Sequence, residues 1–132
     1  MNYLVAYLST TFIFLAIDAL WLGVVAKNFY AGQLGDLMVR NIKLHIAAIF
    51  YLVYTIGIVV FAIMPALAAG KITLAIGYGA LFGFLAYGTY DFTNMATIRD
   101  WPTIVSVVDI IWGTFLTSAS ATLGYLITSQ FS

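Results

Sequence analysis

Residues 3–26 read YLVAYLSTTFIFLAIDALWLGVVA, an apolar run that contains one charged side chain, Asp18. An α-helix needs about 20 apolar residues to cross the hydrocarbon core of a bilayer, and this run is long enough. Three further runs of the same character follow, at residues 46–69, 72–90 and 103–128. Together they predict an all-α polytopic membrane protein, a bundle of four transmembrane helices that forms one domain over residues 1–132.

The composition favours a bilayer over water as the surroundings of the chain. Hydrophobic residues make up 64% of it and charged residues 8%, whereas soluble domains carry about 25% charged residues. The runs do not alternate polar and apolar residues, which excludes a membrane β-barrel. The apolar runs make the lipid bilayer a predicted partner. The net charge is zero, so nucleic acid is not a predicted partner. The absence of cysteine excludes disulfides, thiolate chemistry and cysteine metal sites.

The spacer between the second and third runs determines how these two helices pair. Only Gly70 and Lys71 separate them, which forces an antiparallel hairpin. Gly70 suits the left-handed position that follows a helix end. Pro65, near the end of the second run, is expected to kink that helix without abolishing it, because neighbouring groups can satisfy the freed carbonyl.

The basic residues are divided unequally between the two ends of the predicted bundle. Four crossings place both termini on one side with Lys71 and place the other basic residues on the opposite side: Lys27, Arg40, Lys43 and Arg99. Loops rich in lysine and arginine stay in the cytoplasm. The first and third connections are therefore predicted to be cytoplasmic and both termini external. Within the first connection, residues 29–38 are interpreted as a short amphipathic helix at the interface.

Two carboxylates inside the apolar runs are the strongest sign of a functional site. Asp18 and Asp109 lie in the first and fourth runs, and each is followed three residues later by a tryptophan, Trp21 or Trp112. A carboxylate within a membrane helix is costly, so it usually faces a partner or a wet cavity. The alternative is structural, with both carboxylates only accepting hydrogen bonds and fixing the register of the helices.

Other polar residues fall at the same level, in the predicted cytoplasmic half of the bundle. The candidate functional cluster therefore comprises Asp18, Trp21, His45, Tyr90, Asp91, Asn94, Asp109 and Trp112. Asp91 closes the predicted third helix and is equally consistent with a cap. For His45, a single histidine at the interface, a surface or hydrogen-bonding role is favoured over a functional one. The two tryptophans are equally consistent with packing.

The sequence assigns no catalytic residue, cofactor or metal. Three aspartates and one histidine would suit a hard or borderline cation, but the chain has no HExxH motif and no clustered histidine. It also lacks a nucleophile elbow, a phosphate-binding glycine loop and a dinucleotide fingerprint. No metal site is predicted, and the catalytic residues and cofactors remain unassigned.

Small residues predict close packing of the last two helices. Helical spacing from Asp109 gives one stripe on the fourth helix, made of Ser106, Asp109, Gly113, Thr117, Ser120 and Gly124. The third helix carries Gly79 and Gly83 at the small-xxx-small spacing. Such residues let two helices approach closely in lipid, where packing drives association. Asp109 is accordingly predicted to point into the bundle.

Four segments carry a family resemblance: Asp18-Ala-Leu-Trp-Leu-Gly, Tyr90-Asp91-Phe-Thr93-Asn94-Met-Ala96-Thr, Arg99-Asp100-Trp101-Pro102 and Asp109-Ile-Ile-Trp112-Gly113. With them the chain resembles, over essentially its whole length, a family of small bacterial inner-membrane proteins of unknown function. The tyrosine-aspartate-x-threonine-asparagine segment is the most specific part. The resemblance implies a four-helix protein of the bacterial inner (plasma) membrane, so that the external termini would be periplasmic. It implies no activity.

Three functions are compatible with a polar cluster in one half of a four-helix bundle. The leading hypothesis is transport of a proton, cation or small solute by a homo-oligomer, because four helices enclose little room for a path. The second is a membrane-embedded lipid-modifying enzyme or accessory subunit, with a pocket open to the cytoplasmic leaflet. The third is a structural partner of another membrane protein. A cavity that reaches one face or both faces would discriminate between them.

Reporter fusions test the predicted orientation. A phosphatase that folds only outside the cytoplasm should be active when fused after Ser132, and a fluorescent protein that folds only inside should be dark there. Fusions after Leu34 serve as the reciprocal control and should give the opposite pair of signals. A fluorescent fusion at Ser132 would contradict the orientation and move the polar cluster to the outer half of the membrane.

Overall fold

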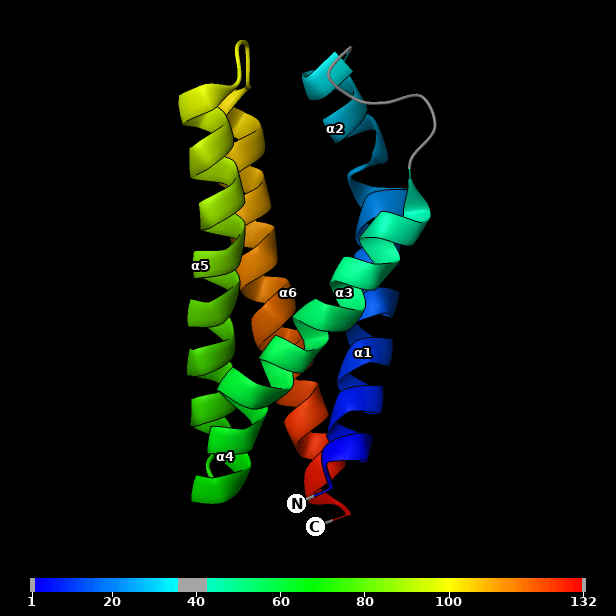
Figure 1. The fold of residues 1–132 in the computed structure, drawn as a ribbon, viewed down its shortest axis with the longest axis vertical. Helices are drawn as coiled ribbons and strands as arrows, with labels where there is room; N and C mark the ends of the chain where they lie inside the picture. The colour runs from blue at the N-terminus through cyan, green and yellow to red at the C-terminus, as the bar shows by residue number, and fades with distance from the viewer. Residues whose placement is uncertain (1, 36–42, 132) are drawn as a thin grey trace.

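A computed structural model describes residues 2–35 and 43–131, and these residues form a bundle of helices without strands (Figure 1). Four helical stretches are long and apolar enough to cross a membrane: Tyr3–Val25, Leu44–Ala69, Ile72–Thr97 and Thr103–Ser129. The elements are α1 (Tyr3–Leu20), the π-helical turn η1 (Trp21–Val25), α2 (Lys27–Leu34), α3 (Leu44–Ile58), the π-helical turn η3 (Val59–Ile63), α4 (Met64–Ala69), α5 (Ile72–Thr97) and α6 (Thr103–Ser129). The all-α, four-span architecture is confirmed.

The third membrane helix is longer than predicted. α5 continues past Tyr90 to Thr97, so the prediction that it ends at Tyr90 was wrong. Residues 91–97 are polar enough to end an apolar run, but they contain no glycine or proline that would break a helix. Asp91 and Asn94 are therefore helical, and the connection to α6 is confined to residues 98–102.

Both described chain ends lie at one end of the bundle, together with the turn between α4 and α5 (Figure 1). Gly70 in that turn is left-handed, with φ 65° and ψ 31°, as predicted. The opposite end, called the α2 end below, holds α2, the start of α3 and residues 98–102. Lys27, Lys43 and Arg99 are exposed at the α2 end. Arg40 and part of the predicted interfacial helix lie outside the described residues.

The tightest packing in the bundle joins α5 to α6. A Cβ added to Gly79 would come within 2.9 Å of the Cα of Ser118, and one added to Gly83 would overlap the carbonyl oxygen of Gly113. Five residues of the predicted stripe on α6 are buried: Ser106, Gly113, Thr117, Ser120 and Gly124. Gly113 lies against Tyr87 of α5, whereas Gly124 lies against Thr10 of α1 and Ile63 of η3. The predicted close packing of the last two helices is confirmed, since the glycines allow backbone to meet backbone.

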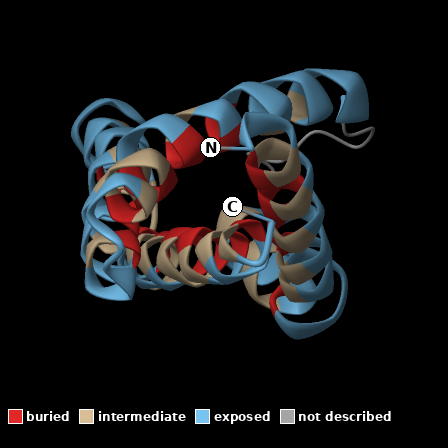
Figure 2. Ribbon diagram, turned by 90° about the horizontal axis from the view of Figure 1, so that it is seen from below, coloured by how far each residue is buried: buried red, intermediate tan, exposed pale blue. Residues whose placement is uncertain are grey.

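Buried residues line the interior of the bundle and exposed residues lie on its outside (Figure 2). Phe14, Ile58, Ile63 and Leu116 are completely buried in the core, and some polar side chains form hydrogen bonds within it. The hydroxyl of Thr11 donates to that of Thr55 at 2.9 Å, for example. Many large apolar side chains are exposed, as expected where lipid is the solvent.

The second membrane helix bends and leaves α5 at the α2 end. Pro65 lies at the start of α4, directly after the π-helical turn η3, which agrees with the predicted kink because proline cannot donate to the carbonyl four residues earlier. η3 and α4 pack on α5, whereas α3 packs mainly on α1. Figure 1 shows α3 crossing the bundle obliquely and diverging from α5 toward the α2 end.

Replacing Gly83 tests the contact between α5 and α6. Gly83→Ala should lower the unfolding free energy by about 1–3 kcal/mol, because the added Cβ meets backbone that cannot move aside. Gly77→Ala on the same helix is the matched control, since no heavy atom would lie within 4 Å of its Cβ. Thermal unfolding in one detergent gives the comparison. Equal stability of the two variants would refute the contact.

Candidate functional site

Asp18 and Trp112 meet inside the bundle. Asp18 of α1 is only 5% exposed, and its Oδ1 accepts a hydrogen bond of 3.2 Å from the indole Nε1 of Trp112 on α6. The hydroxyl of Tyr51, on α3, lies near the same carboxylate. The indole of Trp112 stacks on that of Trp21, with ring centroids 4.3 Å apart and planes 10° from parallel. Three helices thus contribute to the surroundings of Asp18.

A second set of contacts leads from Trp21 to Asp109. The Nε1 of Trp21 is 3.4 Å from the hydroxyl of Tyr30, and this hydroxyl donates to Asp109 Oδ1 at 3.2 Å. The two membrane carboxylates are therefore connected by three aromatic residues, Trp112, Trp21 and Tyr30, which are called the aromatic bridge below. The geometry brings together the four residues that the repeated aspartate–tryptophan spacing singled out: Asp18, Trp21, Asp109 and Trp112.

Tyr30 reaches Asp109 because the first membrane helix ends in a π-helical turn. Trp21 opens this turn, and the amide of Ala26 donates to the Trp21 carbonyl at 2.7 Å. The turn leads directly into α2, which carries Tyr30. Burial raises the pKa of the Tyr30 phenol, and the negative charge of Asp109 raises it further. The phenol therefore stays protonated at neutral pH and remains a hydrogen-bond donor.

Asp91 is completely buried rather than placed at a helix end near water. Neither of its carboxylate oxygens has a hydrogen-bond partner among the described residues. The carboxyl group of Asp109 is close enough to interact with it electrostatically. The main chain of Asp91 is fixed independently: Ser106 donates to its carbonyl at 3.2 Å and accepts 2.9 Å from the indole of Trp101. Interpreting Asp91 as a cap was wrong, because α5 continues beyond it.

Of the remaining predicted residues, Tyr90 and Asn94 lie close to the cluster and His45 does not. Tyr90 is 56% exposed and meets the ring of Trp101 edge-on at 5.9 Å. Asn94, one helical turn further along α5, interacts with the Tyr90 hydroxyl. His45 lies exposed at the start of α3 and does not line the cavities described below. The structure therefore does not bring His45 into contact with the carboxylates.

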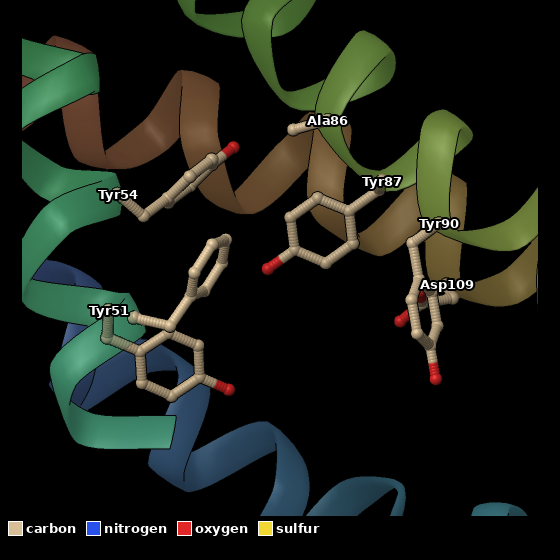
Figure 3. A pocket seen from close by; sticks show the side chains of 7 residues that line it. Tyr51, Tyr54, Ala86, Tyr87, Tyr90 and Asp109 are labelled. Carbon is tan, nitrogen blue, oxygen red and sulfur yellow. The ribbon is translucent and has the colours of Figure 1, made fainter. Parts of the chain in front are cut away.

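Two cavities meet at Asp109. The tyrosine cavity, about 270 Å³, lies between α3 and the α5–α6 pair and is lined by Phe50, Tyr51, Tyr54, Ala86, Tyr87, Tyr90 and Asp109 (Figure 3). The α2 cavity, about 220 Å³, is lined by Leu22, Tyr30, Leu34, Tyr90, Trp101, Val105 and Asp109. Tyr90 and Asp109 line both, so these two side chains form the shared boundary.

Packed side chains separate the tyrosine cavity from the end of the bundle that holds the termini. The hydroxyls of Tyr54 and Thr117 share a hydrogen bond of 2.8 Å, and Tyr54 stacks on Phe82 with centroids 5.1 Å apart. The completely buried Phe14 and Ile58 belong to the same packed core. The polar cluster is thus associated with cavities at the α2 end.

Sequence reasoning identified Tyr90 but missed the other tyrosines of this site, which are Tyr30, Tyr51, Tyr54 and Tyr87. Tyr51 and Tyr54 are three residues apart on α3, and Tyr87 and Tyr90 are three residues apart on α5. Residues at this spacing share a helix face, so the pairs could have been noticed as facing aromatic walls. Tyr30 gave no comparable signal, because its position depends on the π-helical turn before it.

No three histidine, cysteine or acidic side chains of the described residues come together in a way that could hold a metal ion. What the arrangement offers instead is a carboxylate, Asp109, at the junction of two cavities with aromatic walls. A carboxylate in this setting can accept a hydrogen bond, take up a proton or pair with a cation.

Fold and site define an integral membrane protein with four spans and inward-facing carboxylates at one end. The chain belongs to the family described as "Predicted membrane protein (DUF2177)", whose family model matches residues 3–126. This confirms the membrane-protein family expected from the aspartate–tryptophan and tyrosine-aspartate segments, which all lie within the match. No curated protein and no solved structure matches the chain.

Removing the Tyr30 hydroxyl tests the aromatic bridge. Tyr30→Phe should speed amide hydrogen exchange across α2 by at least about tenfold, because a hydrogen bond to a charged group is worth about 1.5–3 kcal/mol. Tyr78→Phe is the control, since Tyr78 is exposed on α5 and lines neither cavity. Unchanged exchange of α2 in Tyr30→Phe would show that this bond does not hold the helix.

Proposed function

We propose that the protein binds an amphipathic molecule taken from one membrane leaflet, with its polar end at Asp109 and its apolar part in the tyrosine cavity. The observation that carries the proposal is the make-up of this cavity, in which aromatic side chains form the walls and one carboxylate forms a polar end. Ligand sites are typically concave and mostly apolar, with a few polar groups that fix orientation.

The lateral position of the cavity supports loading from lipid. It lies where α3 diverges from α5, and Phe50 and Tyr90, which line it, are 60% and 56% exposed. These residues belong to predicted membrane spans. A molecule already dissolved in the leaflet could enter between the two helices without passing through water.

The packed core weighs against transport through a single copy. A translocation path needs access from both ends, but the completely buried Phe14, Ile58 and Leu116 belong to one packed core together with Tyr54, which lines the cavity. Transport would then require a rearrangement of α3 or a path between copies in a homo-oligomer. The one-ended cavity instead favours a binding role.

A lipid-modifying role is the second candidate. Asp109 is held by the Tyr30 hydroxyl at 3.2 Å beside both cavities. A positioned carboxylate of this kind is the group from which acid or base chemistry would start. In either case we propose that the α2 end faces the cytoplasm of the bacterial inner membrane and the termini face the periplasm.

Filling the cavity tests the proposal. Radiolabelled amphiphiles with one dodecyl chain and different head groups are equilibrated with the protein in phosphatidylcholine nanodiscs, and uptake by empty nanodiscs is subtracted. Wild type should show saturable binding of at least one of them. Ala86→Phe, which fills the tyrosine cavity, should weaken that binding by at least about tenfold. The added ring would occupy the space of the ligand, and the ligand would lose its apolar contacts with the cavity wall.

Ala80→Phe is the matched control for this substitution. Ala80 lies on the same helix but lines a separate groove of about 480 Å³ between α5 and α6. The control should bind like wild type, and all three proteins should give the same melting temperature within a few degrees. The proposal fails if no amphiphile binds saturably, or if Ala86→Phe binds as well as Ala80→Phe.

A further inference from the structure

We infer that the occupant of the tyrosine cavity is an organic cation, an amphipathic amine or quaternary ammonium compound whose positive head lies against Asp109 and the tyrosine rings. The inference rests on the proposed function and names the class of ligand. It follows from three features of the site: its aromatic walls, its carboxyl groups without a basic partner, and the lack of a metal-ligand group among the described residues.

The walls have the chemistry of an organic-cation site. Tyr51, Tyr54, Tyr87 and Tyr90 line the cavity together with Phe50, and Figure 3 shows their rings arranged around one space, with Asp109 at one end. The negatively charged face of an aromatic ring attracts a cation, most strongly when the cation has left water. Several rings around a quaternary ammonium group are the usual form of such recognition.

The ionisable groups of the site are acidic, and no basic side chain is paired with them. Asp109 lines both cavities, and both Asp18 and Asp91 lie near enough to interact with it electrostatically. No lysine, arginine or histidine of the described residues lines either cavity; Lys27, Lys43, His45 and Arg99 are exposed. A carboxylate at membrane depth normally has a partner. A bound cation would supply the missing positive charge.

Asp91 adds an observation from outside the cavity lining. Its side chain is completely buried, and both oxygens lack a hydrogen-bond partner among the described residues. The neighbouring Asp109 carboxyl can satisfy Asp91 only when the two groups share a proton, and the pair then carries one negative charge. Such a pair lowers the cost of bringing a positive charge to this boundary.

The same features exclude other head groups. A phosphate or carboxylate head would meet Asp109 without a lysine or arginine of the described residues to pair with. An inorganic cation would lose its water to tyrosine rings that replace it poorly, and no group of three metal-ligand side chains is found in the described part of the chain. A large, weakly hydrated organic cation suits both the charge and the walls.

A head-group series with a constant tail tests the inference. Dodecyltrimethylammonium is the cation, dodecyldimethylamine N-oxide is the uncharged analogue at neutral pH, and dodecyl sulfate is the anion. Each is measured by the nanodisc equilibration described above. In wild type the cation should bind at least about tenfold more tightly than the N-oxide, the ratio expected for a partly desolvated charge and ring contacts. Dodecyl sulfate should bind most weakly.

Two carboxylate variants locate the charge that is responsible. Asp109→Asn should bring the binding of the cation and the N-oxide to within about threefold of each other, because the amide keeps the size but not the charge. Asp100→Asn is the matched control. Asp100 is exposed at the same end and left-handed, with φ 61°, a conformation that asparagine tolerates, so the preference should persist.

The outcomes separate the two proposals. If no head group binds in a manner sensitive to Ala86→Phe, the proposed function itself fails. If binding is sensitive to Ala86→Phe but the N-oxide or the sulfate equals the cation, the proposed function stands and the inference is overturned. Persistence of the preference in folded Asp109→Asn would also overturn it. The wild-type head-group ratio decides the matter alone if that variant does not fold.

Discussion

The absence of water from the bilayer interior is the constraint on which this structure depends. Every polar group on a membrane helix needs a partner inside the protein, because lipid supplies none. The indole of Trp112 donates to Asp18, the phenol of Tyr30 donates to Asp109, and the hydroxyl of Thr11 donates to that of Thr55. The glycines of α5 and α6 make this possible by letting two backbones approach closely enough to enclose such contacts. Close packing of the helices and hydrogen bonding of their buried polar side chains therefore favour the same arrangement of helices.

The sequence was informative where a pattern repeats along a helix and uninformative where a position depends on a distant element. Run length predicted the four spans, and the small-residue spacing predicted the face that α6 turns toward α5. Hydropathy misplaced the end of α5, because polarity measures the preference for water and not the continuity of backbone hydrogen bonds. The paired Asp18 and Asp109 were identified since charge is rare in such segments. Apart from Tyr90 the tyrosines were not, because only the course of α3 through the bundle sets Tyr51 and Tyr54 opposite Tyr87.

The bend of the second membrane helix links the fold to the proposed site. Pro65 and the π-helical turn before it divide this helix into a part that packs on α5 and a part that leaves it. Because α3 crosses the bundle obliquely (Figure 1), it lies apart from α5 at the α2 end, and Tyr87 borders a cavity there. The cavity is thus a product of backbone geometry some distance along the chain from the residues that line it. Its size can vary with the angle of the bend without any change in the lining residues.

The π-helical turn at Trp21–Val25 has a consequence for how the first membrane helix can change through insertion or deletion. Its amide bonds reach one residue further back than those of an α-helix, so the turn accommodates one extra residue. Loss of a single residue there would return the turn to regular α-helix, so the turn itself would absorb the change with little rotation of the residues that follow. Tyr30 would then keep its side toward Asp109, although the chain between α1 and α2 had become one residue shorter. The π-helical turn is therefore the place at which the first membrane helix can change its length by one residue without separating α2 from the site.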